Sequence, residues 1–366
     1  MARDTTHDLQ PRTDHDGMSR RYATLACKTA IRSRLQATLT RDYEREVLAR
    51  RDEPPQHAAD IAEPVAALPS YRLWSAANRA AQDRMWRVLA QQVDADYARI
   101  RAAADAAEDG ARGSVNVGGV EHVPPYQTRE PIHGQPGGYM LERDDDDLAA
   151  GVLYEAGGNL YALGQGIGNR DSKGERLIAF IRERFGQLEP RRILEMGCSA
   201  GGQSCDYPAA FPGAECHAID LSPGMLKYAH ARAELLGKTV HFHQRDAADT
   251  RFPGESFDLI VSHNLFHEVA AAHMPRILAE CHRLLRPGGV CIHQDVPIQV
   301  GRFDAFQQFL SEWQVDHNHE PFWMDFAEAD LRALMIAAGF AEDATAAEYI
   351  KAMDGPIPWY VVTAVR

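Results

Sequence analysis

A glycine-rich turn in the middle of the chain is the first feature whose residues could do chemistry. Gly197, Gly201 and Gly202 follow directly after the apolar stretch Arg192-Ile-Leu-Glu-Met196. Glycines let the backbone approach a ligand closely, and the free N–H groups at the start of a following helix face that ligand. A dinucleotide-binding turn requires the pattern G-x-G-x-x-G, but Ser199 stands where its second glycine would be. The turn therefore predicts a nucleotide-like ligand and disfavours a nicotinamide dinucleotide.

Two carboxylates end the next two apolar stretches. Asp220 lies 23 residues after Gly197, and an acidic residue there can accept hydrogen bonds from both hydroxyls of a ribose. Its alternative role is to cap the next helix, but Ser222 is the better cap. Asp246 follows the third stretch, where it can accept a hydrogen bond from an adenine amino group. A plain surface turn is the alternative for Asp246.

Two histidines and a glutamate follow the fourth apolar stretch, Phe257-Asp-Leu-Ile-Val-Ser262. Histidine is the usual acid–base group at neutral pH, so His267 and its neighbour Glu268 are candidates for removing a proton. A metal site is the alternative, because His263 and His267 are four residues apart and Asp295 could add a third ligand. Nothing in the spacing requires a metal, and we expect none.

Alternating strands and helices must position these residues. From residue 173 onward, short apolar stretches alternate with helical patterns, which predicts a parallel sheet with right-handed crossovers. Because ligands bind at the carboxyl ends of such strands, the turn, the carboxylates and the histidines are expected at one edge of the sheet. Residues 341–350 and 358–365 are expected to pair as a closing antiparallel hairpin. The other expected strands span residues 192–196, 215–220, 240–243, 257–262 and 290–294.

Five segments, ILEMGCSAGG, AIDLSPGML, RDAAD, FDLIVSHNLFHEV and LLRPGGV, occur in this order. They resemble the successive motifs of class I S-adenosylmethionine-dependent methyltransferases, over about residues 173–366. The resemblance implies an α/β Rossmann-like sheet of seven strands, the last antiparallel, with S-adenosyl-L-methionine as cofactor. Ser199 departs from the family pattern, in which glycine is common. The residues expected at the cofactor are Glu195, Gly197, Ser199, Gly201, Asp220, Leu221, Met225, Asp246, Ala247 and His263.

The resemblance extends to the chemistry. In small-molecule O-methyltransferases a Phe-Asp strand start is followed by a catalytic His-Asp pair, and here Phe257-Asp258 is followed by His267-Glu268 at a similar offset. His267 is therefore the candidate general base for transfer to oxygen, with packing at a helix start as its alternative role. Competing functions are transfer to carbon, nitrogen or sulfur by proximity alone, an NAD-dependent oxidoreductase and a non-catalytic interaction protein. The expected acceptor-binding residues are Tyr161, Arg170, His263 and Trp323.

The rest of the chain divides by composition. Residues 1–18 are polar and are expected to be a disordered tail. Residues 19–110 have a helical apolar period and are expected to form a mainly helical dimerisation or lid domain, so a homodimer is the expected assembly. Residues 111–172, rich in glycine and proline, are expected to be a linker and substrate-covering segment. In it the aspartates 144–147 would begin a helix, with cation binding as their alternative role. Residues 173–366 would bind the cofactor. The aromatic residues between 303 and 323 suit either a lid or a core.

The net charge limits the partners. With 39 basic and 52 acidic residues the formal charge is −13, which argues against nucleic acid, because phosphate-backbone binding requires clustered Lys and Arg. The polar N-terminus has no apolar segment typical of an export signal, and no apolar run is long enough for a membrane. The six cysteines form no C-x-x-C pair and are expected to be reduced thiols. We therefore expect a cytoplasmic protein that acts on a small-molecule methyl acceptor.

Overall fold

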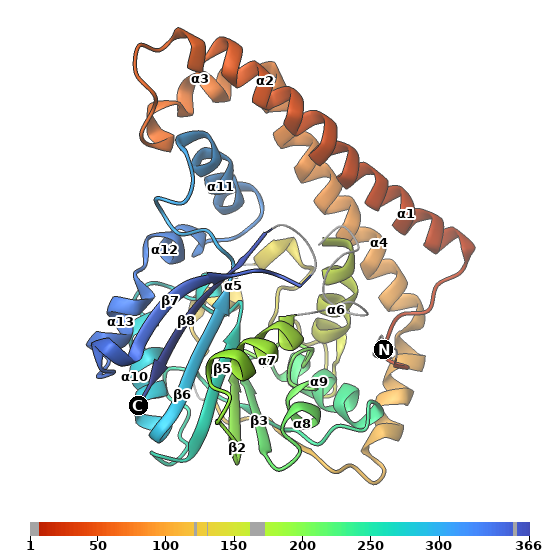
Figure 1. Cartoon of the computed structure of the whole chain (residues 1–366). Coiled ribbons are helices and arrows are strands. Elements are labelled where there is room, and N and C mark those ends of the chain that lie inside the picture. The colour runs from red at the N-terminus through yellow and green to blue at the C-terminus, as the bar shows by residue number, and fades with distance from the viewer. Residues whose placement is uncertain (1–6, 121–122, 130, 162–172, 354–356) are drawn as a thin grey trace.

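A mixed sheet lies at the centre of the computed structural model, which describes residues 7–120, 123–129, 131–161, 173–353 and 357–366. The sheet has eight strands within these residues, in the order β1-β4-β3-β2-β5-β6-β8-β7 (Figure 1). β8 runs antiparallel to β6 and β7, which confirms the predicted hairpin. The Rossmann-like α/β fold is confirmed. The strands are β1 (Ser114–Asn116), β2 (Arg192–Met196), β3 (Glu215–Asp220), β4 (His241–Gln244), β5 (Phe257–His263), β6 (Leu285–Asp295), β7 (Thr345–Ile350) and β8 (Trp359–Val365).

The strand number differs from the seven expected. The additional strand, β1, pairs in parallel with β4, with Ser114 opposite His241 and Asn116 opposite His243. It lies in the segment that the sequence predicts as a linker. Three residues are too short for a periodic pattern, so only their pairing with the edge of the sheet makes them a strand.

Helices cover both faces of the sheet. Successive residues of β2 point to opposite faces, so that Ile193 packs in one apolar cluster and Leu194 in the other. All six cysteines are free thiols. One face carries α7 (Lys173–Arg184), α8 (Tyr207–Ala210) and α9 (Pro223–Leu235), and the other carries α10 (Met274–Leu284), α12 (Trp323–Glu328) and α13 (Leu331–Ala337).

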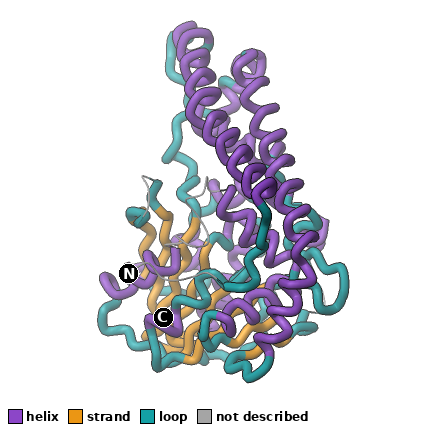
Figure 2. The backbone as a smooth tube through the Cα atoms, turned by 90° about the vertical axis from the view of Figure 1, so that its right-hand side faces the viewer, coloured by secondary structure: helices purple, strands orange, loops and turns teal. Residues whose placement is uncertain are grey.

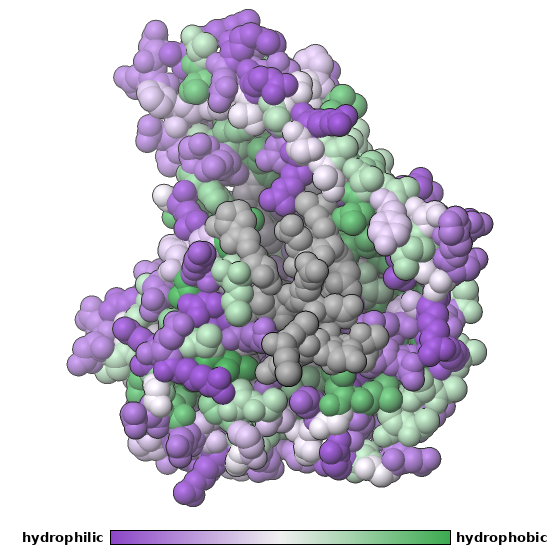
Figure 3. Space-filling view, turned by 45° about the vertical axis from the view of Figure 1, so that its right-hand side comes forward, coloured by the Kyte–Doolittle hydropathy of each residue, from purple (hydrophilic) through white to green (hydrophobic). Residues whose placement is uncertain are grey.

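A long helical arm extends beyond the sheet (Figures 1 and 2). Its main helix is α4 (Pro69–Glu108), against which α1 (His15–Ala30), the π-helical turn η1 (Ile31–Leu35) and α2 (Gln36–Glu46) pack. Although α4 has 40 residues, no helix in the described part of the chain is long and apolar enough to cross a membrane. The tip of the arm, which includes α3 (Ala62–Ala67), is mainly hydrophilic on the face shown in Figure 3.

The aromatic segment after β6 joins the arm to the sheet. It forms α11 (Ala305–His317), which packs under the tip of the arm. The ring of Phe306 stacks on Tyr43 with centroids 4.1 Å apart, and Trp313 meets Trp74 edge to face. Ring pairs of this kind contribute roughly 0.5–1.5 kcal/mol beyond the area that they bury. Phe306 and Trp313 therefore pack in an apolar core, and both Trp313 and Trp323 line the cavity described below.

Residues 7–18 differ from the disordered tail that the sequence predicts. Leu9 is fully buried, a ring nitrogen of His7 lies 3.2 Å from the carboxylate of Glu155, and α1 already begins at His15. The partners of Leu9 lie on α4 and around α6 (Ala149–Tyr161). Because these partners are distant in the sequence, local composition does not predict that residues 7–18 are ordered.

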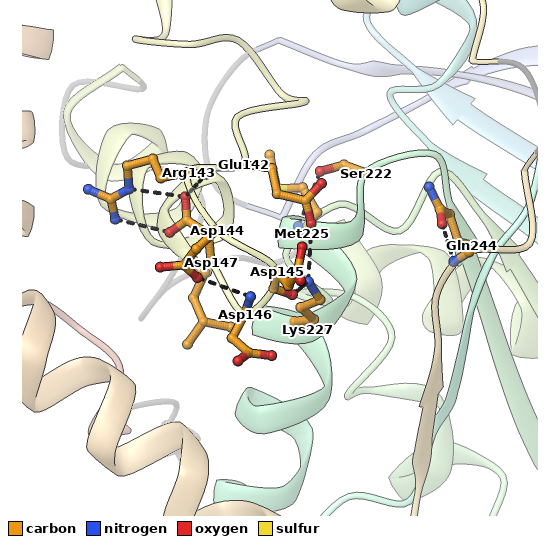
Figure 4. A network of polar contacts seen from close by, with 12 residues as sticks. Glu142, Arg143, Asp144, Asp145, Asp146, Asp147, Ser222, Met225, Lys227 and Gln244 are labelled. Carbon is orange, nitrogen blue, oxygen red and sulfur yellow. Dashed lines mark hydrogen bonds and ion pairs between the residues drawn. The ribbon is translucent and has the colours of Figure 1, made fainter.

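The aspartates 144–147 connect the segment before α6 to neighbouring elements through hydrogen bonds and ion pairs (Figure 4). Asp147 accepts a hydrogen bond from the first backbone N–H of α6, as predicted. Arg101 on α4 pairs with two of the other aspartates. In addition, Ser222 Oγ donates to the carbonyl of Tyr139 at 2.7 Å. These contacts hold the segment beside the carboxyl end of β3.

A pair of histidines on the sheet predicts a pH-dependent stability. His217 on β3 and His243 on β4 have ring nitrogens 3.1 Å apart, and burial together with nearby positive charge, including Arg192, lowers the pKa of each to about 4. In the unfolded chain each pKa returns to 6.5, so the unfolded state binds more protons between these values. The free energy of unfolding therefore falls as the pH drops through this window, by on the order of 2 kcal/mol in total after allowance for solvent screening.

Urea unfolding at neutral pH and near pH 5 measures this effect. The double variant His217→Gln/His243→Gln removes both titrating rings and is the comparison. We expect the variant to lose most of the difference between the two pH values. An equal pH dependence in both proteins would assign it to other groups.

Candidate active site

A cavity of about 720 Å³ opens at the carboxyl ends of the central strands and continues toward the helical arm. Its position agrees with the rule that open α/β sheets bind ligands at this edge. Other walls include residues of α4, of α11, of α5 (Pro125–Arg129) and of the segment 133–140. The predicted site residues that line it are Gly197, Ser199, Asp220, Leu221, Asp246, Ala247, His267, Glu268 and Trp323.

The turn after β2 has the backbone that its glycines predict. Gly197 has φ +70°, and a Cβ there would lie 2.8 Å from Leu265 Cδ1. Ser199 also has a positive φ, +47°, a conformation that costs a non-glycine residue roughly 1–2 kcal/mol. Its backbone N–H donates to Asp220 Oδ2 at 2.9 Å, which offsets part of that cost. The serine that departs from the family pattern thus keeps the conformation that a glycine would adopt.

Asp220 connects the turn to the next helix. Its Oδ1 accepts a hydrogen bond from the backbone N–H of Ser222 at 3.0 Å, and Ser222 Oγ in turn accepts from the N–H of Met225. Ser222 is therefore the helix cap, as predicted. The buried carboxylate of Asp220, which also lines the cavity, retains acceptor capacity for a ribose. Burial raises its pKa despite these N–H groups.

Other predicted cofactor residues are placed behind the cavity wall. Among the described residues, Glu195, Gly201, Met225 and His263 do not line the cavity. Glu195 accepts a hydrogen bond from Ser204 Oγ. His263 hydrogen-bonds through Nε2 with the hydroxyl of Tyr207 at 2.7 Å, so its ring is engaged within the fold. The side chain of Tyr161 and the whole of Arg170 lie outside the described residues.

His267 lies in a short 3-10 turn, η5 (Phe266–Glu268), after β5. Its Nδ1 is 2.5 Å from Asp295 Oδ1 at the end of β6, and Asp295 Oδ2 accepts from the backbone N–H of Phe266 at 2.9 Å. The ring of Trp323 meets the imidazole edge to face, with centroids 5.7 Å apart. Burial lowers the pKa of His267, but Asp295 and then Glu268 and Glu320 raise it more, to about 9. The imidazole thus has a fixed orientation, and the surrounding carboxylates stabilise its protonated form.

Glu268 is surrounded by three side chains that the sequence analysis does not predict at the site. The hydroxyl of Tyr139 donates to Glu268 Oε1 at 3.0 Å, and His133 Nε2 lies 3.4 Å from the same oxygen. His133 also pairs through Nδ1 with Glu320. Glu320 is almost fully buried, with 1% of its side chain exposed. No motif or spacing links residues 133, 268 and 320.

The arrangement places the imidazole of His267 beside the glycine-rich turn. Leu265, which contacts the position of Gly197, is two residues before His267. A ligand on the turn and an imidazole at the cavity wall are therefore neighbours. Positioning two reactants in this way converts a bimolecular reaction into an effectively unimolecular one.

Comparisons with known proteins find a methyltransferase domain in the region that holds the turn and the two carboxylates. Residues 193–289 match a family model described as a methyltransferase domain. A phthiotriol/phenolphthiotriol dimycocerosates methyltransferase of Mycobacterium leprae is 33% identical over 129 residues, 35% of this chain and 43% of that protein. A malonyl-(acyl-carrier protein) O-methyltransferase of Methylococcus capsulatus is 39% identical over 119 residues, 32% of this chain and 40% of that protein. The chain thus spans less than half the length of these two relatives.

Solved structures are also similar in part. Phosphoethanolamine N-methyltransferase 2 of Haemonchus contortus, in complex with S-adenosyl-L-methionine, has a TM-score of 0.40 and 18% identity, with 52% of each chain covered. In the present chain, Asp220 and Gly197 both line the cavity, where they fit the ribose and the backbone-bound part of S-adenosyl-L-methionine, the cofactor of this domain. Residues 193–289 thus match a methyltransferase domain, which agrees with the resemblance of the sequence motifs to class I S-adenosylmethionine-dependent methyltransferases.

Proposed function

We propose that the protein transfers the methyl group of S-adenosyl-L-methionine to an oxygen atom of a small molecule. The observation that supports this most is the His267–Asp295 pair, 2.5 Å apart, in the wall of the cavity that also holds the cofactor turn. Transfer to oxygen requires removal of a proton, and an oriented imidazole is the usual group for this. Transfer to carbon, nitrogen or sulfur by proximity alone is the competing proposal.

The proposed reaction is an in-line displacement. The acceptor oxygen forms a bond to the methyl carbon as the bond from that carbon to sulfur breaks, and both electrons of the broken bond stay on sulfur. The hydroxyl proton passes to Nε2 of His267, and Asp295 stabilises the resulting imidazolium. The products are the methyl ether or ester and S-adenosylhomocysteine.

The rest of the cavity suggests an acceptor with a large apolar surface. Trp74 and Trp86 of the arm and Trp313 of α11 line the part of the cavity under the arm, together with the amides of Asn78 and Gln82. Aromatic walls with a few amide groups are typical of pockets for small organic molecules. We propose that the arm covers the acceptor.

A direct assay tests this function. The full chain is incubated with S-adenosyl-L-methionine carrying a labelled methyl group and with matched aromatic or acyl compounds that bear a hydroxyl, a carboxyl, an amine or a thiol. We expect labelled product only with oxygen acceptors, in step with S-adenosylhomocysteine formation. Transfer only to the amine or thiol members would contradict the proposal.

The arm is also the proposed surface for a homodimer. Tyr22 on α1 and Leu73 on α4 are 64% and 57% exposed, and large exposed apolar side chains often mark association surfaces. Light scattering is expected to give twice the mass of the chain. The variant Tyr22→Asp/Leu73→Asp is expected to give the single mass, and a wild-type monomer would contradict the proposal.

A further inference from the structure

Four side chains converge in the wall of the cavity and form what we call the His–Glu cluster: His133, His267, Glu268 and Glu320. Each offers a ligand atom, and these atoms all lie within 4.8 Å of one another. They come from three separate segments, namely η4 (Ile132–Gly134), η5 and the loop after α11. Two imidazoles and two carboxylates are a donor set suited to first-row divalent cations.

We propose that the His–Glu cluster binds one divalent cation of the class Zn²⁺, Mn²⁺ or Fe²⁺. Nothing in the residue spacing predicts this site, because His133 and Glu320 are distant from the His267-Glu268 pair in the sequence. The catalytic role of the cation rests on the proposed function, because it assumes an oxygen acceptor. Cation binding itself can be measured without any acceptor.

The first support is the way in which both imidazoles are held. Asp295 fixes Nδ1 of His267, so that Nε2 is left for the cluster, and a carboxylate on the distal nitrogen is the usual support of a metal-binding histidine. His133 has φ +56°, an uncommon conformation for a residue other than glycine. Its carbonyl accepts hydrogen bonds from Gln82 Nε2 at 2.8 Å and Trp86 Nε1 at 2.7 Å. The arm thus holds a strained histidine in place.

The second support is an excess of buried acceptor groups. Glu268 and Glu320 each have an Oε2 that is buried and makes no hydrogen bond within the described residues, and side-chain exposure is 12% and 1% respectively. Asp295, which is 1% exposed, adds a third carboxylate. Even when both imidazoles carry a proton, the three carboxylates leave this group with a net negative charge. Because buried charges require compensation, a divalent cation would supply what the described protein groups do not.

A cation in the His–Glu cluster would face the acceptor. It would lower the pKa of a coordinated hydroxyl, and the hydroxyl proton would pass to Glu268 Oε2 while the methyl group moves from sulfur to oxygen. In this state Nε2 of His267 is a ligand, so the cation takes over the role that the imidazole has in the cation-free protein. The electron count of the transfer is unchanged, since the sulfur again keeps both electrons of the broken bond.

The test is a titration of the chelator-treated full chain with Zn²⁺ and Mn²⁺, followed by calorimetry and by metal analysis after gel filtration. We expect one cation per chain with micromolar or tighter affinity. The variant Glu320→Gln is expected to weaken it by at least roughly 100-fold, whereas Glu312→Gln on the neighbouring helix is the matched control and is expected to bind normally. No stoichiometric binding by wild type, or equal binding by Glu320→Gln, would overturn the site.

Two further measurements separate this inference from the proposed function. S-adenosylhomocysteine affinity is expected to be equal in the Glu320→Gln variant and wild type, which shows that the fold is intact. Methyl transfer to an oxygen acceptor is expected to be lost with chelator and restored by added cation. Transfer that is fully insensitive to chelator would overturn the catalytic role of the cation and leave the His267 base in force. Absence of transfer to oxygen under all conditions would instead refute the proposed function.

Discussion

Replacing His267 with alanine is expected to lower kcat for methyl transfer by roughly 10²–10⁴-fold, the usual contribution of a positioned general base. The imidazole is fixed by Asp295 and faces the cavity, so its loss removes the group that makes the acceptor oxygen nucleophilic. The affinity for S-adenosylhomocysteine should be unchanged. Among the described residues, no hydrogen bond joins the side chain of His267 to the glycine-rich turn. Steady-state kinetics and calorimetry measure the two quantities.

Two variants sharpen this prediction. Asp295→Asn keeps the shape of the positioning residue but removes its charge and favours the wrong imidazole tautomer, so we expect a lower kcat with little change in KM. His15→Ala, at a side chain that is 94% exposed, is the control and should retain full activity. A His267→Ala protein with near-normal kcat would instead support transfer to carbon, nitrogen or sulfur by proximity.

Replacing Asp220 with alanine is expected to weaken the binding of S-adenosylmethionine and S-adenosylhomocysteine by about 100-fold. Hydrogen bonds to a charged group contribute roughly 1.5–3 kcal/mol each, and about 1.4 kcal/mol corresponds to a factor of ten. The variant loses the proposed ribose contacts and also the acceptor for the Ser199 N–H, which holds the turn in its positive-φ conformation. Calorimetric titration of the folded variant measures the change.

Asp258→Ala is the matched control for this prediction. Asp258 lies on β5, and its carboxylate also accepts two backbone N–H groups, those of Arg191 and Arg192 at 2.8 Å. It is not among the described residues that line the cavity. The control is expected to be less stable but to bind cofactor normally. Equal affinity losses in both variants would mean that Asp220 acts only through general stability.

The central sheet and the cofactor edge are determined largely by local sequence. Strands such as β2 and β5 are buried between two layers, so their central residues are mostly apolar. The turn after β2 needs a positive φ at Gly197, and the side chain at residue 222 caps a helix through a local hydrogen bond. Requirements of this kind act over a few residues and leave a recognisable pattern, which is why the turn, Asp220 and Asp246 could be predicted.

Only the tertiary structure decides the catalytic wall. The ring of His267 is oriented by Asp295, which lies on another strand, and His133 and Glu320 reach Glu268 from segments without any periodic or motif pattern. The same holds for Leu9, which is buried by helices distant in the sequence. Long-range contacts of this kind depend on how the arm, the connecting segment and α11 pack together. A single sequence records which side chains are available, but their convergence follows from packing between elements far apart in the chain.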